Sequence, residues 1–273
     1  MMFSSTLQEQ LYWEGERRCS IITSRGIIAI IERDIKKMSR YKFFLAMRTI
    51  SFIVHVLIFG VTASAIVNYP NFYKFYLLGV YSSILFSMST YMGYDVIDEA
   101  QDGLFDYYLS LPISRRELII GKTIGSGLTA LSYSLPMLII ISLLIGINSP
   151  YRVLLAVFSA SLFALGVSGF MISITLAIKS ADIADIAFGV VSTLLIRLST
   201  IYYPLAVMPT YYRVLAEFNP ITHLADFLRF VILGEGYSIP PEGSLIALIG
   251  LAAGSISVAV ILIEKAIEGG RWR

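Results

Sequence analysis

The sequence predicts an all-α membrane protein with six transmembrane helices. Its 273 residues are 56% hydrophobic and only 15% charged, which is too apolar for a soluble domain. A helix needs roughly 20 apolar residues to cross a bilayer. Six stretches meet or approach this requirement: 50–67, 75–94, 123–151, 153–178, 186–208 and 243–263.

The distribution of Lys and Arg predicts the orientation of these spans. Four segments on one side hold nine, three, one and three of these residues: 1–48, 95–122, 179–185 and 264–273. The other side holds four: Lys74, Arg152, Arg213 and Arg229. Cytoplasmic loops carry the excess of basic residues, so we expect both termini in the cytoplasm and a multi-pass protein in the plasma membrane. This bias accounts for the net charge of +2, and we expect no nucleic-acid partner.

Two different segments precede the first span. Residues 1–24 are polar, lack the apolar core of a signal peptide, and are expected to form a cytoplasmic N-terminus. Residues 25–48 place apolar side chains at helical spacings among basic ones, which predicts an amphipathic helix in the inner headgroup layer. This helix can serve as an anchor alone or also hold a partner. The single cysteine, Cys19, excludes an internal disulfide.

The charged segment 95–122 interrupts the second and third spans and carries the most local structure. Its acidic residues are expected to begin a short helix, with negative charge at the positive end of the helix dipole: Asp98, Glu99 and Asp102. The next apolar side chains follow at i, i+3, i+4 and i+7 and form one stripe: Leu104, Tyr107, Tyr108 and Leu111. Pro112 ends this helix, and Ser114 to Glu117 form a capping box that opens the third span.

Two interpretations of this segment remain. The stripe can lie on lipid, with Arg115 and Arg116 at phosphates, or the helix can dock into a groove of a cytoplasmic protein. A simple connection between helices needs about 2–8 residues. The length of this segment therefore favours docking.

On the outer side, only residues 209–242 have room for structure. Asn219-Pro220 opens a short helix there, and its apolar stripe is expected to lie on or dip into the outer leaflet: Ile221, Leu224, Leu228, Val231 and Ile232. We therefore expect a six-span domain over 49–263 and a cytoplasmic tail over 264–273.

Small residues recur on helical faces of the third and fourth spans: Gly121, Gly125, Ser159, Gly166 and Gly169. Such patterns let helix backbones approach closely. Packing within the chain is favoured here over a dimer seam. Pro136 and Pro204 predict kinks in the third and fifth spans.

Two basic residues fall inside predicted spans. Arg197, within the fifth, costs about 2.5–3.5 kcal/mol to insert. It can face a translocation path or a dimer seam, or it can hydrogen-bond to Ser192, Thr193 and Thr200. His55, within the first span, is expected to be a packing residue rather than a proton relay.

The sequence predicts no catalytic residue, metal site or cofactor in this chain. Gly121-Lys122-Thr123 resembles the end of a phosphate-binding loop, but Arg116 stands where that loop requires a glycine. The chain has only two histidines and no HExxH motif, which excludes an intramembrane metalloprotease.

The segment 95–122 resembles the first cytoplasmic loop of type-2 ABC transporter permeases. In that family an acidic stretch, a glycine and a short coupling helix precede a Leu-Pro-x-Ser-Arg-x-Glu-Leu-x-x-Gly-Lys run. The matching residues here are Glu99, Gly103, Tyr107 to Leu109, Leu111 to Leu118, and Gly121-Lys122. A second match resembles the end of span five and the outer helix: Tyr203-Pro204-Leu205, Met208-Pro209, Phe218-Asn219-Pro220 and Leu228-Arg229 through Gly234. The resemblance covers residues 25–270.

This resemblance implies the permease subunit of an ATP-driven exporter. Two copies, expected to be identical, would form the path and associate with two cytoplasmic ATPase subunits that bind ATP and Mg²⁺. The implied coupling residues are Asp98, Glu99, Asp102, Gly103, Leu104, Phe105, Tyr108, Leu109, Pro112, Arg115 and Arg116. The charged members would fix orientation, and Leu104, Phe105, Tyr108 and Leu109 would supply contact area.

Two other functions stay open. An ion-coupled secondary transporter usually places acidic groups near the midplane, and no predicted span contains one. A membrane scaffold or assembly protein could use the same fold without transport, but it would not require a complete coupling segment.

Overall fold

In the computed structural model, every regular element of the described residues is helical. These residues are 24–38, 42–67, 71–111, 113–147, 149–178 and 181–268. The elements are α2 (Ser24–Met38), α3 (Lys42–His55), the π-helix η1 (Val56–Gly60), α4 (Val61–Ile66), α5 (Phe72–Gln101), α6 (Leu104–Ser110), α7 (Arg115–Ile145), α8 (Pro150–Ala177), α9 (Ala181–Arg197), the 3-10 helix η2 (Leu205–Val207), α10 (Thr210–Glu217), α11 (Pro220–Ile232) and α12 (Pro241–Glu268).

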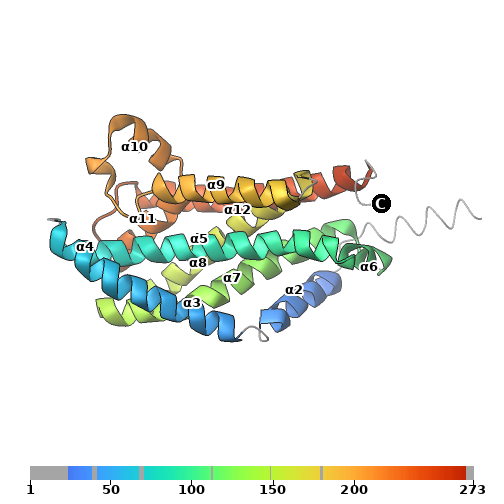
Figure 1. Cartoon of the computed structure of the whole chain (residues 1–273), viewed down its shortest axis with the longest axis horizontal. Helices are drawn as coiled ribbons and strands as arrows, with labels where there is room; N and C mark the ends of the chain where they lie inside the picture. The colour runs from blue at the N-terminus through green and yellow to red at the C-terminus, as the bar shows by residue number, and fades with distance from the viewer. Residues whose placement is uncertain are drawn as a thin grey trace, which may run out of the picture.

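The long helices run along one axis, with α2 and α6 at one end and α4 and α10 at the other (Figure 1). Four stretches are long and apolar enough to cross a membrane: Leu45–Ile66, Arg115–Ile145, Pro150–Ala177 and Pro241–Glu264. They correspond to expected spans one, three, four and six. The other two expected spans fall on α5, which has 30 residues of mixed polarity, and on α9, which has 17 residues.

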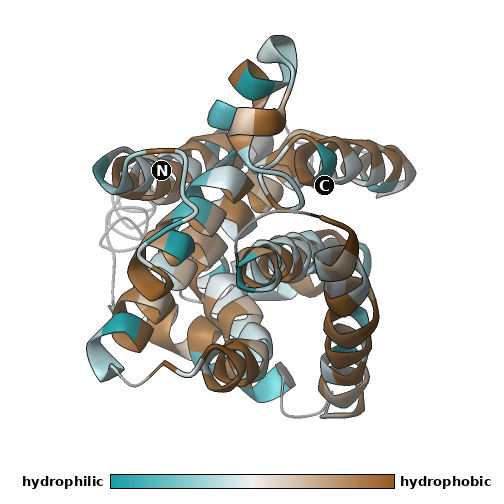
Figure 2. Ribbon diagram, turned by 90° about the vertical axis from the view of Figure 1, so that its left-hand side faces the viewer, coloured by the Kyte–Doolittle hydropathy of each residue, from teal (hydrophilic) through white to brown (hydrophobic). Residues whose placement is uncertain are grey.

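Hydrophobic residues, brown in Figure 2, recur along the long helices. Large hydrophobic side chains such as Phe43, Leu143, Ile186 and Ile246 are at least 70% exposed. A soluble protein rarely exposes so much contiguous apolar surface. Lipid is the solvent that these faces require, and the chain is a membrane protein.

Several expected boundaries differ in the structure. The helix expected over 25–48 is divided, because α2 ends at Met38 and α3 begins at Lys42 and continues toward the first span. At the other end of the chain, α12 extends to Glu268, beyond the expected end of span six. Residues 1–23, within the expected N-terminal segment, and 269–273 of the tail lie outside the described residues.

The fifth expected span ends early, at Arg197. The backbone N–H of Thr200 donates to the Thr222 hydroxyl at 3.2 Å, so the chain leaves the helix to pack on α11. Pro204 therefore caps η2 and does not kink α9. Pro136 does lie inside a helix, α7. Arg197 is the last residue of α9, and its side chain is exposed on this chain, so it does not lie in the middle of that helix.

The small residues pack helices of this chain together, as expected. A Cβ added to Gly121 would lie 3.0 Å from Cβ of Ile30, and one added to Gly125 would lie 2.6 Å from Oδ2 of Asp34. Both partners belong to α2. Gly166 and Gly169 in α8 meet Leu251 and Ser255 of α12 in the same way.

We expect Gly125→Ala to lower stability, although alanine is the better helix former. The added methyl group must displace Asp34, and overpacking of this kind costs about 1–3 kcal/mol. The matched control is Gly254→Ala in α12, where no atom lies within 4 Å of the added Cβ. That variant should keep or raise the melting temperature, since Gly→Ala in a helix interior gains up to about 1 kcal/mol. Equal melting temperatures of the two variants in detergent would contradict the close packing of α2 on α7.

The helix α11 is part of the core of the chain, so its apolar stripe is covered by other helices. Ten of its 13 residues are buried. Its apolar side chains Ile221, Leu224 and Leu228 are completely covered within the main hydrophobic cluster. Asn219 caps its first turn by accepting from the Ile221 N–H at 3.0 Å.

A buried ion pair lies on α11. Arg229 is 0% exposed and donates to the carboxylate of Asp226 at 2.8 Å and to the Thr200 carbonyl at 2.7 Å. Its guanidinium lies 3.5 Å from the centre of the Phe75 ring. The second Asp226 oxygen accepts from the N–H groups of Ser238 and Ile239. One ion pair thus joins α5, α11, the turn after α9 and the loop before α12.

Candidate functional site

The short helix α6 lies between two long helices at one end of the bundle (Figure 1). The helix α5 continues to Gln101, so Asp98 and Glu99 lie in its last turn and not, as expected, in the first turn of the short helix. Gly103, at φ 72°, has the left-handed conformation that glycine adopts easily, and α6 begins after it. A carboxylate at a helix C-terminus is unfavourable unless a cation compensates it.

The apolar stripe of α6 packs inward on this chain. Tyr108 is 7% exposed and belongs to a cluster with Ile30, Val96 and Leu118, against which Leu104 and Leu111 also pack. Its neighbour Tyr107 is 59% exposed. Three of the four stripe residues, Leu104, Tyr108 and Leu111, therefore pack on this chain, and Tyr107 does not. The outward face of α6 carries Tyr107 instead.

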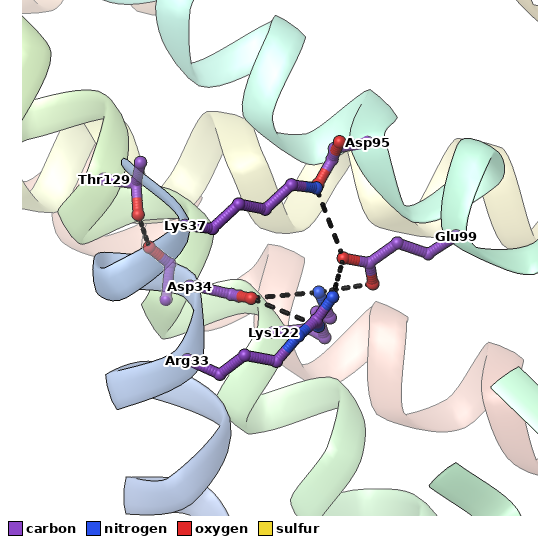
Figure 3. A network of polar contacts seen from close by, with 8 residues as sticks. Arg33, Asp34, Lys37, Asp95, Glu99, Lys122 and Thr129 are labelled. Atoms are coloured by element: carbon purple, nitrogen blue, oxygen red, sulfur yellow. Dashed lines mark hydrogen bonds and ion pairs between the residues drawn. The ribbon is translucent and has the colours of Figure 1, made fainter. Parts of the chain in front are cut away.

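Six charged side chains from three helices meet behind α6, as Figure 3 shows: Arg33, Asp34 and Lys37 of α2, Asp95 and Glu99 of α5, and Lys122 of α7. We call this group the ion cluster. Lys122 is paired with Glu99 at 2.5 Å and with Asp34 at 3.1 Å. Glu99 also contacts Arg33 at 2.7 Å, and Lys37 contacts both Asp95 and Glu99. Three positive charges face three negative ones.

The side chains at the centre of the ion cluster are buried, which strengthens their electrostatic interactions. The side chains of Lys122, Glu99 and Asp34 are 2%, 3% and 9% exposed. Burial alone would raise the pKa of Glu99, but the ammonium of Lys122 and the guanidinium of Arg33 outweigh it and hold that pKa below its ordinary value. For Asp34 burial prevails, reinforced by the Glu99 charge, and its pKa is raised despite Lys122. Glu99 is thus the carboxylate on which the cluster is centred.

The ion cluster extends to α6 through Arg33. Its guanidinium lies 5.1 Å from the centre of the Tyr108 ring. Burial and the nearby Glu99 carboxylate raise the pKa of Tyr108 to about 12. Because Arg33 also pairs with Glu99, one side chain of α2 holds both α6 and the last turn of α5.

The other expected coupling residues divide by exposure. Asp98, Asp102, Gly103, Arg115 and Arg116 are exposed. Arg116 donates to Glu264 of α12 at 2.5 Å. The side chains of Phe105 and Leu109, and the whole of Pro112, lie outside the described residues. The charged face of the segment is therefore accessible, whereas Glu99 and Tyr108 are engaged within the chain.

The expected capping box is present at the start of α7. The Ser114 hydroxyl accepts from the Glu117 N–H at 3.2 Å, and the Glu117 carboxylate accepts from the Ser114 N–H at 2.7 Å. A Cβ on Gly26 of α2 would lie 3.3 Å from that carboxylate. The cap thus fixes α7 and also contacts α2.

Arg197 lies elsewhere, at the end of α9 away from α6. It lines an open pocket of about 380 Å³ with Tyr203, Met208 and Tyr212. Within the described residues no group of three His, Cys, Asp or Glu could hold a metal ion.

The ion cluster was not predicted from the sequence. Arg33 and Lys37 were assigned to the headgroup layer, and Lys122 to the start of the third span, without partners. One signal was available: Ile30 and Asp34 repeat the four-residue spacing of Gly121 and Gly125, and these pairs pack face to face.

A comparison with protein families finds one described as ABC-2 type transporter, whose model matches residues 25–233, more than half of the chain. A search of curated proteins finds no match. The matched region includes the ion cluster, α6 and α11.

Proposed function

From the premise that this chain belongs to the ABC-2 type transporter family, and so is the permease of an ABC transporter, we propose that it works as an exporter driven by a separate ATPase. Two identical copies form the path across the plasma membrane, and each is served by a cytoplasmic ATPase subunit that binds ATP and Mg²⁺. Six spans cross the bilayer, including α5 and α9, with α2, α6 and both termini on the cytoplasmic side.

The observation that carries this proposal is the construction around α6. A seven-residue helix with an exposed face is connected at each end to a long helix. Tyr107 is exposed on it, and Asp98, Asp102, Arg115 and Arg116 present charges of both signs nearby. Such a surface suits docking to a soluble protein, in which a central aromatic anchor is surrounded by polar groups.

The ion cluster connects the docked helix α6 mechanically to the long helices. When ATP closes the ATPase pair, its movement displaces α6. Tyr108 and Glu99 are held by Arg33, and Glu99 is paired with Lys122, so α6 cannot move without α2, α5 and α7. Displacement at the cytoplasmic end thereby tilts these helices. ATP acts through its different affinity for the open and closed arrangements of the ATPase pair.

We expect Tyr107→Glu to weaken ATPase binding by about tenfold or more, as an interface anchor does when it is lost. The measurement is the amount of ABC-type ATPase that co-purifies with the tagged chain from its native membranes. Tyr211→Glu is the matched control, because Tyr211 is 65% exposed on α10 at the opposite end. Both variants should melt like the unaltered protein. Normal co-purification with Tyr107→Glu would show that α6 does not dock through this face.

Export is tested with inside-out vesicles that contain the chain and its ATPase. Substrate uptake should require ATP and should persist when ionophores remove the ion gradients. Uptake that needs a gradient and not ATP would identify a secondary transporter instead.

A further inference from the structure

Arg197, the last residue of α9, has a guanidinium that no other described residue neutralises or hydrogen-bonds. A basic residue at the end of a helix usually interacts with the last backbone carbonyls. Here other donors already occupy the three carbonyls that precede Arg197, those of Leu194, Leu195 and Ile196. Because the helix end is satisfied without it, this guanidinium is available to a ligand.

Arg197 lines a pocket of about 380 Å³ at the end of the bundle opposite α6, where α9 ends near α10 (Figure 1). Ligand pockets in proteins have volumes of about 300–1,000 Å³ and combine apolar walls with a few polar groups. The other described lining residues are apolar or aromatic: Leu198, Tyr203, Val207, Met208, Pro209 and Tyr212. The pocket therefore has the size and composition to bind a small organic molecule or the end of a larger one.

Two tyrosines add hydroxyl groups to the same lining. Tyr203 and Tyr212 are exposed, and within the part of the chain that the structure describes neither hydroxyl forms a hydrogen bond. A phenol can donate through its O–H, and a guanidinium has donors only. No acidic side chain occurs among the described lining residues. An anion with oxygen acceptors is therefore the complementary ligand.

The backbone around Arg197 is fixed on both sides. Before it, the Leu195 carbonyl accepts from the side-chain amide of Asn219 at 2.6 Å. After it, the Thr200 N–H donates to the Thr222 hydroxyl at 3.2 Å. Asn219 caps α11 and Thr222 lies in it, so the buried helix holds the end of α9 in place. A site on a rigid backbone loses less entropy when a ligand binds.

A second arginine holds another wall of the pocket. Arg213 donates to the carbonyls of Leu205 and Ala206 at 3.2 and 3.3 Å. These carbonyls belong to η2, which leads into the lining residues Val207 and Met208. The guanidinium of Arg213 therefore stabilises this turn, and the wall is formed before a ligand arrives.

The hydrophobic lining restricts the anion further. Leu198, Val207 and Met208 offer apolar surface to whatever occupies the pocket. An inorganic anion would leave this surface in contact with water, whereas a ring or a hydrocarbon chain would cover it. Because the burial of apolar surface favours association, the pocket suits an anion that carries an apolar body.

We propose that this pocket binds an organic anion, whose charged oxygens pair with Arg197 and accept from Tyr203 and Tyr212. Its apolar body lies against the hydrophobic lining. Such an anion arrives from water or as the head group of a lipid, and both sources share this chemistry. Binding is a property of this chain and does not depend on the proposed function, so it is tested on the chain alone.

The test uses the purified full-length chain in an uncharged detergent at constant concentration and measures binding by calorimetry. Phenyl phosphate is the water-soluble probe, and benzyl alcohol is its uncharged control. Dioctanoyl phosphatidic acid is the lipid probe, and dioctanoylglycerol is its uncharged control. At least one of the two organic phosphates should bind about tenfold more tightly than its control, since a hydrogen bond to a charged group is worth about that factor.

The organic phosphate that binds more tightly identifies the source of the ligand. Inorganic phosphate, which has no apolar body, should bind more weakly than either. Equal affinity of both organic phosphates and their uncharged controls would contradict the anion. Equal affinity of inorganic phosphate and the organic phosphates would contradict the apolar body.

Substitutions of Arg197 locate the anion. Arg197→Met removes the charge and should weaken binding of the organic phosphate by about tenfold or more. Arg197→Lys keeps the charge but loses the paired donors of the guanidinium, and it should retain an intermediate affinity. Arg152→Met is the control, because Arg152 is exposed at the start of α8 and does not line this pocket. It should bind normally.

Melting curves show whether each variant is folded. Since no described residue hydrogen-bonds or pairs with the Arg197 side chain, Arg197→Met should melt like the unaltered protein. Normal affinity for both organic phosphates in folded Arg197→Met would overturn the site.

The contribution of the phenols is tested on two neighbouring residues of α10. Tyr212→Phe removes one hydroxyl of the lining and should weaken binding by about threefold or more. Tyr211→Phe is its matched control, because Tyr211 is exposed and does not line the pocket. Equal affinities of these two variants would contradict the hydrogen bond from Tyr212 to the anion.

Discussion

Replacing Lys122 by methionine should destabilise the protein by about 3–5 kcal/mol, the usual cost of removing one partner from a buried ion pair. Methionine fills a similar volume but removes the most buried of the cations that pair with Glu99 and Asp34. Arg33, which also pairs with both carboxylates, and Lys37 are about one third exposed and replace it only in part. The melting temperature in detergent should fall steeply, and α2 should become accessible to protease.

The control for this variant is Arg116→Met. Arg116 also pairs with a carboxylate, that of Glu264, at the same distance of 2.5 Å, but its side chain is 54% exposed. Exposed ion pairs contribute about 0–1 kcal/mol. The two variants therefore distinguish the effect of burying an ion pair on stability from the effect of the pairing itself. Similar losses in both would mean that the ion cluster holds the helices no more firmly than a surface contact does.

The second large effect is expected for Arg229→Met, again about 3–5 kcal/mol. Asp226 would keep its N–H donors from Ser238 and Ile239 but lose the guanidinium that neutralises it. The carbonyls of Phe75 and Thr200 would lose a donor as well. The variant should melt early and yield little folded protein.

Arg213→Met is the matched control at the same end of the molecule. Arg213 donates to the carbonyls of Leu205 and Ala206 near the surface, and its loss should cost about 1 kcal/mol. The double variant Arg229→Met/Asp226→Leu should recover part of the lost stability, because it removes the uncompensated charge. If the double variant is no more stable than Arg229→Met, the pair is held by packing and not by charge.

Local patterns in the sequence were reliable where one helix contains the whole pattern. The capping box at Ser114 and Glu117 needs residues three apart, and the structure has both of its hydrogen bonds. Of the six long apolar runs expected to cross a membrane, four lie in stretches that are long and apolar enough to do so. The spacing of Gly121 and Gly125 predicted close packing within the chain, because only a helix face was required.

Long-range pairing was not predictable in the same way. Asp34 and Lys122 are 88 residues apart, and each taken alone resembles a surface charge. Tyr107 and Tyr108 are adjacent and chemically identical, so the sequence could not decide which faces the core. Arg229 was assigned to an outer loop from the distribution of Lys and Arg, which does not consider the residues that these side chains pair with. The environment of each of these side chains depends on which other helix packs against its own, and a single sequence does not specify that.

The separation of these partners in the sequence also determines when they can pair during biosynthesis. The helix α2 leaves the ribosome long before Glu99 and Lys122 exist, and Asp34 must wait for a residue made 88 positions later. At about 5–20 residues per second, that delay is roughly 4–18 seconds. During it, the amphipathic α2 has only the membrane surface to cover its apolar side. Its docking onto α7 is therefore a late event, and the nascent helix must first rest on lipid and then leave it.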